Sequence, residues 1–290
     1  MPAADAAGKR TIITRGTTLH RTVKRLALLA VTGLSVLGAT LPAPAAPAVE
    51  TPDGEIMIVT ANLDEAYTSQ DMQNLGEMKI FAKRLKAQVP FAPDVLLLQE
   101  VRDRSATKVA RLMRKKFNQR YIVAVNPGSP PTKEFGRKQI HKETAIVINT
   151  ATIAKRSKGG YIATEYDRSA AAPGAKIVTR KNAHLLVEEK SSDVRVAVAS
   201  IHFNPAAQMK SSSVSDRNRG RWAREIATAL NNKYPAAAHD NIGGDFNSDR
   251  CKGTQVGDNC TLNPFWKILT ADFGYVDSVR EAKRDESGGV

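Results

Sequence analysis

An uninterrupted apolar run, DVLLLQEV at residues 94–101, constrains the fold more than any other stretch of this sequence. A strand with one face in water alternates apolar and polar residues, whereas a run without alternation is typical of a strand covered on both faces. Pro90 and Pro93 end the helical pattern that precedes the run. The sequence therefore predicts a sheet that other layers cover on both sides.

Helical and strand patterns alternate along the first half of the chain. Apolar residues recur at helical spacing over residues 71–89 and 106–117, and strand patterns occupy residues 55–63, 121–126 and 143–149. In the second half, HLLVEEK and VRVAVASIHF read as neighbouring strands, and GDFN lies on a later one. This order predicts an α/β fold with mixed sheet layers faced by helices.

The helix expected over residues 213–232 has two faces. Trp222 and Ile226 are expected to point inward, and four arginines are expected to point largely outward: Arg217, Arg219, Arg221 and Arg224. Between the strands, the polar and basic stretch from residue 127 to about residue 139 reads as a loop.

The N-terminus reads as an export signal. Basic residues precede an apolar stretch at 26–41, and LPAPAAPAVE follows with small residues suited to cleavage after Ala45 or Ala48. We expect residues 1–45 to be a signal peptide, 46–54 a disordered lead-in and 55–290 one domain. The protein would then be secreted or extracytoplasmic, without a stable membrane span after cleavage. An uncleaved anchor is the alternative, although the apolar stretch is short for one.

The charge balance is strongly basic, with 43 Lys and Arg against 29 Asp and Glu. Such an excess favours polyanionic partners, namely nucleic acid, anionic lipid or acidic glycan. Charge that serves solubility alone is the alternative. The sequence carries no signal for an oligomeric state.

Polar side chains close several of the expected strands. Asn62 ends the first strand, Glu100 closes the apolar run and His202 ends VRVAVASIHF. Asp245 and Asn247 stand two residues apart behind paired glycines, so both can point to one side. Each residue alone could be a strand end, a turn or a hydrogen-bonded core histidine. Together they suit chemistry on a phosphodiester at the ends of strands.

In this order, the segments TANL, LLLQEV, SIHF and GDFN resemble the endonuclease/exonuclease/phosphatase family of metal-dependent phosphoesterases. The stretches DVLLLQEVRD and HKETAIVIN are similar to the deoxyribonuclease I branch of that family. The resemblance covers most of the chain after residue 55. It implies a four-layer sandwich of two packed mixed β-sheets flanked by helices.

The resemblance also implies a role for each matching residue. Glu100 would hold Mg²⁺, with Mn²⁺ or Ca²⁺ as alternatives, and Asn62 would lie close by. The remaining roles concern the phosphate: His202 acts on the leaving side, Glu143 orients the ring of His202, Asp245 activates or aligns the attacking water, and Asn247 binds a phosphate oxygen. Arg102 and Arg180 would contact nucleic acid, with a solvated surface position as the alternative for both.

Two cysteines, Cys251 and Cys260, follow GDFN closely. An exported protein can form a disulfide there, and the deoxyribonuclease branch has a similar disulfide-bearing region. Two free thiols are the alternative, and metal binding is disfavoured because no histidine or further cysteine accompanies the pair.

The sequence departs from the family pattern in two places. The family normally has a late Asp motif and a Ser-Asp-His motif, and neither occurs before Val290. We therefore expect the last sheet strands to be missing and a neighbouring strand edge to be unpaired. His141 stands where the deoxyribonuclease branch has an aromatic groove-contacting residue. Either the sequence is a fragment, which we favour, or the protein binds without cutting.

These observations predict a secreted, Mg²⁺-dependent phosphodiesterase, namely an endonuclease of low sequence specificity on double-stranded DNA. The alternatives are a sphingomyelinase-type phospholipase, another phosphatase of the same family, or a catalytically impaired polyanion-binding fragment. The low aromatic content, 6%, and the basic loop after residue 127 count against a membrane-contacting phospholipase.

Overall fold

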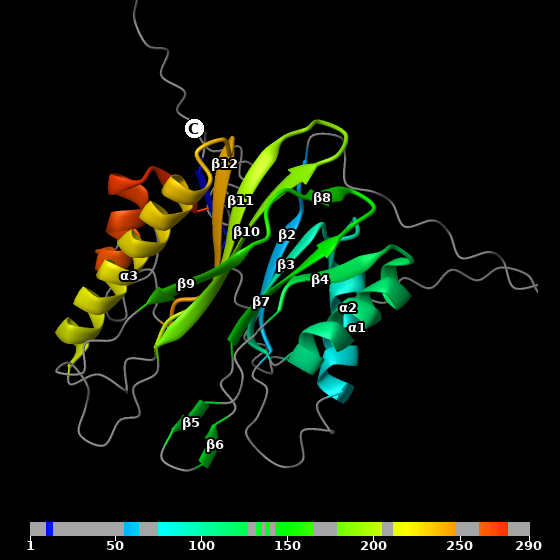
Figure 1. Ribbon diagram of the computed structural model, residues 1–290, viewed down its shortest axis with the longest axis horizontal. Helices are drawn as coiled ribbons and strands as arrows, with labels where there is room; N and C mark the ends of the chain where they lie inside the picture. Colours follow the sequence, from blue (N-terminus) through cyan, green and yellow to red (C-terminus); the bar gives the residue numbers. More distant parts are fainter. Residues whose placement is uncertain are drawn as a thin grey trace, which may run out of the picture.

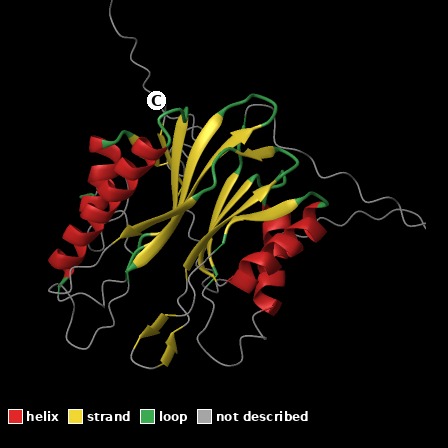
Figure 2. Ribbon diagram, in the orientation of Figure 1, coloured by secondary structure: helices red, strands yellow, loops and turns green. Residues whose placement is uncertain are grey.

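Two β-sheets pack face to face, and helices cover both outer faces (Figures 1 and 2). The computed structural model describes residues 10–13, 55–63, 75–101, 103–126, 132–134, 137–139, 143–164, 179–204, 211–247 and 261–277. Both sheets are mixed, because each contains parallel and antiparallel pairs. The predicted fold class, a sandwich of two mixed sheets flanked by helices, is confirmed.

The smaller sheet has four strands in the order β2-β3-β7-β4. Their bounds are β2 (Ile58–Asn62), β3 (Val95–Val101), β7 (Glu143–Asn149) and β4 (Tyr121–Val125). Its outer face is covered by α1 (Leu75–Gln88) and α2 (Asp103–Phe117). Strands β2 and β3 run parallel, so their carboxyl ends reach the same edge.

The larger sheet has seven strands, in the order β13-β1-β12-β11-β10-β8 with β9 also paired to β10. Their bounds are β13 (Tyr275–Asp277), β1 (Arg10–Ile13), β12 (His239–Asp245), β11 (Arg195–His202), β10 (Arg180–Glu189), β8 (Ile153–Lys155) and β9 (Gly160–Thr164). Three helical elements pack on its outer face: α3 (Ser212–Lys233), α4 (Pro264–Lys267) and the π-helix η3 (Ile268–Asp272).

The apolar run of β3 faces two different cores. Val95 and Leu97 join the core between the sheets, whereas Leu96 and Leu98 join the core beneath α1 and α2. All four side chains are fully buried. The strand lacks alternation because both of its faces are covered, as the sequence predicted.

Buried polar groups tie the two sheets together just below the strand ends. Gln99 Nε2 donates to Ser200 Oγ at 2.9 Å, and Ser200 Oγ donates to the carbonyl oxygen of Leu98 at 2.9 Å. Because both side chains are buried, losing either partner would leave the other unsatisfied. This link fixes the relative position of β3 and β11, which both end at the site described below.

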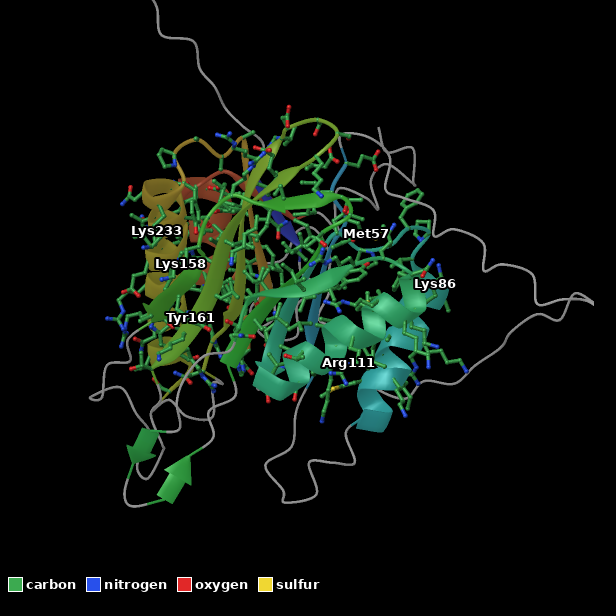
Figure 3. The ribbon with its side chains drawn as sticks, turned by 45° about the vertical axis from the view of Figure 1, so that its right-hand side comes forward. Met57, Lys86, Arg111, Lys158, Tyr161 and Lys233 are labelled. Atoms are coloured by element: carbon green, nitrogen blue, oxygen red, sulfur yellow. The ribbon has the colours of Figure 1, made fainter. Side chains whose placement is uncertain are left out.

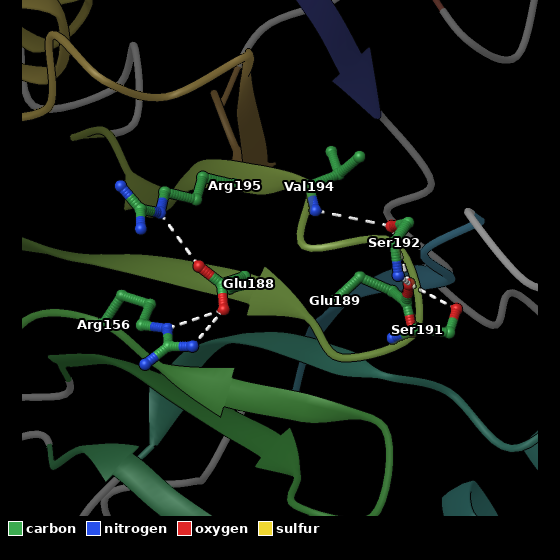
Figure 4. Close-up of polar contacts among 7 residues, drawn as sticks. All are labelled: Arg156, Glu188, Glu189, Ser191, Ser192, Val194 and Arg195. Atoms are coloured by element: carbon green, nitrogen blue, oxygen red, sulfur yellow. Dashed lines mark hydrogen bonds and ion pairs between the residues drawn. The ribbon is translucent and has the colours of Figure 1, made fainter.

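At the opposite end of β11, Glu188 of β10 binds one arginine of β11 and one that directly follows β8 (Figure 4). Its carboxylate accepts from Arg156 Nε at 2.8 Å and from Arg195 Nε at 2.8 Å. Hydrogen bonds from Arg156 and then Arg195 hold the pKa of Glu188 below its usual value. The adjacent Glu189 accepts from the backbone of Ser191 and Ser192 and closes the β10–β11 turn. These ion pairs and hydrogen bonds therefore stabilise this end of the sheet.

The structure differs from the sequence expectations at two elements. The stretch expected to be a loop contains a short hairpin, β5 (Thr132–Glu134) with β6 (Arg137–Gln139). The edge of β12 is not open, because β1 pairs with it in parallel and then pairs with β13. β1 comes from the segment predicted to be a signal peptide, and its cleavage stays a prediction. Among the described helices, none has the length and hydropathy of a membrane-spanning segment.

Candidate functional site

Four polar side chains meet where strands of both sheets end. Asn62 closes β2 and Glu100 lies near the end of β3, and β2 and β3 are parallel neighbours. His202 closes β11 and Asp245 closes β12, and these two residues are directly paired in the parallel register. Because the two sheets pack face to face, the paired strand ends of one sheet lie against those of the other.

Three short contacts link the four side chains. Asn62 Nδ2 donates to Glu100 Oε1 at 3.1 Å and to Asp245 Oδ2 at 2.8 Å. His202 Nε2 lies 3.5 Å from Glu100 Oε1. The Glu100 side chain is 18% exposed and that of His202 is 5% exposed. The carboxylate of Glu100 is thus more accessible to solvent than the neighbouring imidazole of His202.

The backbone at Glu100 adopts an uncommon conformation. Its φ is 55°, in the left-handed region that residues other than glycine seldom occupy. The pairing of β3 with β7 also shifts register between Leu98 and Val101, so Glu100 lies within an irregular stretch of the strand. Such conformations cluster at functional sites, where surrounding contacts hold them in place. The irregularity lies at the residue whose carboxylate faces Asn62 and His202.

The turn after β12 fixes both oxygens of Asp245. The backbone N–H of Asn247 donates to Asp245 Oδ1 at 2.7 Å, while Asn62 holds Oδ2. Asn247 itself has a φ of 49° and donates from Nδ2 to the carbonyl oxygen of Phe203 at 2.6 Å. Asn tolerates this left-handed conformation better than most residues do. The sequence D-F-N therefore builds a rigid turn around the carboxylate.

The second glycine of the pair is required by the approach of a neighbouring strand. Gly244 has a φ of 150°, and a Cβ atom built on it would lie 2.1 Å from the carbonyl oxygen of Ile201. Any side chain would therefore push β12 away from β11. The glycine lets Asp245 reach its place opposite His202.

Arg219 was expected to point largely outward, but the structure places it inside. Its residue exposure is 3%, and its guanidinium donates to the backbone carbonyl oxygen of Asn247. Burial lowers the pKa of Arg219, while the charges of Asp216 and Asp245 act in the opposite direction. The signal was present in the sequence, because Arg219 lies three residues before Trp222 and seven before Ile226, on the inward face of α3.

Two further buried polar residues lie near His202 and were not singled out in the sequence. Asn182 is buried on β10 and accepts from the backbone N–H of His202 at 2.9 Å. Asn204 is fully buried two residues after His202, and its Oδ1 accepts from Arg180 Nε at 2.8 Å. Arg180, predicted to contact nucleic acid, therefore lies at the same edge of the sheet as His202.

The remaining predicted residues are only partly described. The backbone of Glu143 pairs with Val101 in the β3–β7 ladder, but its side chain lies outside the description. Arg102, Cys251 and Cys260 lie outside the described residues, so their predicted roles and the disulfide stay predictions.

The donor set suits a divalent cation. Glu100, His202 and Asp245 each offer a ligand atom, and these atoms all lie within 4.8 Å of one another. Two carboxylates this close repel each other when both are ionised, and a cation would balance them. Carboxylate oxygens are the ligands that Mg²⁺ and Mn²⁺ prefer. The residues present therefore fit the metal that the sequence resemblance implies.

Comparisons with known proteins give similarity at the level of solved structures. No protein-family model and no curated protein matches the sequence. A mannosyl-6-phosphatase from Bacteroides thetaiotaomicron is 12% identical, with a TM-score of 0.47 over 75% of this chain and 71% of that one. The human Nocturnin catalytic domain with bound sulfate is 18% identical, with a TM-score of 0.43 over 69% of this chain and 63% of that one.

A humanized D. rerio TDP2 carrying 14 mutations is 15% identical, with a TM-score of 0.40 over 77% of this chain and 68% of that one. Another Bacteroides thetaiotaomicron structure is described as an endonuclease/exonuclease/phosphatase family protein, at 12% identity and a TM-score of 0.47. A structure from Leptotrichia buccalis, 16% identical with a TM-score of 0.43, carries the same family description.

Proposed function

We propose that this protein is an exported, Mg²⁺-dependent phosphodiesterase of the endonuclease/exonuclease/phosphatase family that cleaves DNA with little sequence preference. The observation that carries the proposal is the convergence of Asn62, Glu100, His202 and Asp245 at one edge of two packed sheets. These residues are the ones that the sequence resemblance names, and they come from segments as distant as residues 62 and 245.

Glu100 and Asn62 would hold the cation, and the Glu100 carboxylate is more accessible than the His202 ring. Bound there, a divalent cation would neutralise charge on a scissile phosphate and so favour attack on phosphorus. Glu100 is suited to this role because its backbone conformation and the Asn62 hydrogen bond fix the direction of its carboxylate.

Asp245 is placed to accept a proton from, or to orient, the attacking water. Each of its oxygens already accepts one hydrogen bond, from Asn247 N–H or from Asn62 Nδ2, and each retains a further lone pair. Because hydrogen bonds fix both oxygens of this carboxylate, it loses little conformational entropy when it aligns the water. Such positioning lowers the activation barrier.

His202 is placed to donate a hydrogen bond or a proton to the leaving oxygen. It lies directly opposite Asp245 in the β11–β12 register, and Asn182 accepts a hydrogen bond from its backbone N–H. An in-line displacement needs the nucleophile and the leaving group on opposite sides of phosphorus. Asp245 and His202 on neighbouring strands can serve those two sides.

The choice of DNA rests on charge and on the sequence resemblance. The chain has a formal net charge of +14, of which the predicted signal peptide holds six basic residues and one acid. The remaining charge of +9 favours a polyanionic substrate. Export rests on the predicted signal peptide. A phospholipase or a phosphatase of small substrates would use the same core residues, and a polyanion-binding protein would use the charge alone.

Nicking of supercoiled plasmid tests the proposal, with Mg²⁺ or EDTA and with Asp245→Asn beside the matched control Asp193→Asn. Asp193 is an exposed turn residue at the far end of the sheet, so its substitution should change nothing. We expect EDTA-sensitive nicking that Asp245→Asn reduces by about a thousandfold. Folded protein that cleaves sphingomyelin vesicles or p-nitrophenyl phosphate but not plasmid would overturn the choice of substrate. Folded protein without any hydrolysis would overturn the enzyme proposal.

A further inference from the structure

The outer surface of α1 and α2 carries a dense group of positive charges. Lys and Arg occupy ten positions on these two helices, and the structure describes the side chains of nine. Eight of the nine are exposed: Lys79, Lys83, Arg84, Lys86, Arg111, Arg114, Lys115 and Lys116. Lys108 is the ninth and is half-buried. Two acids, Glu77 and Asp103, occur in the sequences of the two helices. We call these nine residues the basic face.

The charges of the basic face are not neutralised by the described part of the protein. None of its nine members forms an ion pair with a described acidic residue. The helical layer on the other side of the molecule differs. There Arg219 pairs with Asp216, Arg221 with Glu225 and Arg224 with Asp272. Three other cations of that layer, Arg217, Lys233 and Lys267, form no ion pair with a described acid, compared with nine on the basic face. The unpaired charge is therefore greater on the flank of α1 and α2.

Helix stability accounts for only part of the basic face. Cations in the last turn of a helix interact favourably with its dipole, which explains Lys86, Arg114, Lys115 and Lys116. Lys86 also lies over the ring of Phe117, and Arg114 donates to the carbonyl oxygen of Tyr121. Neither effect applies to Lys79, Lys83 or Arg111, which lie before the last turn. Their exposed, unpaired charges repel one another unless an anionic partner covers them.

We propose that the basic face is a second docking surface for the phosphate backbone of nucleic acid, separate from the strand-end site. The helices have 14 and 15 residues, so each is about 21 Å long, which matches roughly six base pairs of duplex. Each helix runs back from the strand-end site toward the start of the next strand. The basic face therefore lies along a flank, and the site lies at its end. Figure 3 shows Lys86 and Arg111 on this flank and Lys158 and Lys233 on the other.

An anionic membrane is the less favoured partner. Membrane-surface helices insert an apolar face into the lipid, whereas the apolar faces of α1 and α2 are buried against the sheet. Ile80 is the single large apolar side chain exposed among the described residues, at 48%. A surface with many charges and one exposed aliphatic side chain suits duplex DNA, because the phosphates lie on the outside of the duplex.

The proposal deepens the proposed function, but it is tested by binding without cleavage. Fluorescence anisotropy with a labelled DNA duplex, in EDTA and over a series of salt concentrations, would compare two triple variants of the full chain. One is Lys83→Gln, Arg111→Gln and Lys115→Gln on the basic face. The matched control is Lys158→Gln, Arg217→Gln and Lys233→Gln on the other flank. All six side chains are exposed, so both variants should keep the wild-type fold and Tm.

We expect the basic-face variant to bind at least about tenfold more weakly and to lower the slope of log K against log salt by roughly 2 to 3, because each lost phosphate contact removes about 0.9. The control should change affinity by less than about threefold. Equal losses in the two variants would overturn the proposal, since they would report net charge alone. Binding to vesicles of anionic lipid but not to DNA would also overturn it. Because binding is measured in EDTA, where no cleavage is required, a failure of cleavage leaves this test intact.

Discussion

Asn62 Nδ2 lies 2.8 Å from Asp245 Oδ2, although the two residues close strands of different sheets. The same amide nitrogen lies 3.1 Å from Glu100 Oε1, so one NH₂ group separates two carboxylates. The amide N–H groups reduce the repulsion between the two carboxylates, but the amide carries no positive charge to neutralise them. The charge that is left over is what a divalent cation would balance.

A third carboxylate at this position should make the fold depend more strongly on metal. We expect Asn62→Asp to lower Tm by about 3 °C in EDTA, because three carboxylates would then share one site. Mn²⁺ should raise the Tm of this variant more than that of the wild type. Thermal scans with EDTA and with Mn²⁺ measure both effects. Asn232→Asp, at an exposed position of α3, is the control and should respond to neither. An equal response of wild type and Asn62→Asp to Mn²⁺ would contradict a metal at this site.

Arg219 should matter for the site although it comes from a helix behind it. Its buried guanidinium donates to the Asn247 carbonyl oxygen. The ammonium of a lysine is more compact and lacks the planar guanidinium, so it would not reproduce this contact. We expect Arg219→Lys to destabilise the fold by about 2 kcal/mol and to reduce nicking about tenfold. Chemical denaturation and the plasmid assay measure these losses. Arg217→Lys, two residues away and exposed, should change neither. Full activity of folded Arg219→Lys would show that the turn needs no support from α3.

The sequence predicted the site better than it predicted the support around the site. The polar strand ends could be placed because each follows a readable strand, and parallel strands end at a common edge. Arg219 was misplaced because arginine is seldom buried, so its position in the helical period received less weight than its charge. β1 could not be predicted at all. Its pairing with β12 depends on a register between residues 11 and 241, and no local pattern carries that information.

Gly244 should tolerate substitution far less than another glycine with positive φ. An Ala Cβ atom at Gly244 would lie 2.1 Å from the Ile201 carbonyl oxygen, whereas one at Gly274 would meet nothing within 4 Å. We expect Gly274→Ala to cost about 1 kcal/mol from the backbone alone, and Gly244→Ala to cost several times more or to prevent folding. Urea denaturation of both variants makes the comparison. Similar midpoints for the two would contradict the close approach of β11 and β12.

His184 should make the fold sensitive to acid. It is buried, its Nδ1 lies 2.6 Å from Tyr234 Oη, and burial followed by the charge of Lys233 lowers its pKa to about 4. The unfolded chain binds a proton near pH 6.5, whereas the folded chain binds one only near pH 4, so stability falls as pH drops between these values. We expect His184→Gln to reduce that loss by on the order of 1 to 2 kcal/mol. Denaturation midpoints at pH 7 and pH 5 test this, with exposed His239→Gln as the control.

β1 should stabilise the larger sheet even though it comes from the predicted signal peptide. Thr11, Ile12 and Ile13 pair with Asn241, Ile242 and Gly243 of β12, and β1 in turn pairs with β13. Without β1, the backbone groups on that side of β12 would lose their partners next to Asp245, and an unpaired edge promotes association between chains.

We therefore expect the chain from residue 46 onward to melt about 5 °C below the full chain, or to form dimers. Ile12→Pro in the full chain should lower Tm in the same direction, because proline cannot donate within a central strand. Ala6→Pro, outside β1, is the control. A synthetic peptide with the sequence KRTIITR should restore the Tm of the shorter chain. If Ile12→Pro and Ala6→Pro melt together and the peptide has no effect, β1 contributes nothing to the stability of β12.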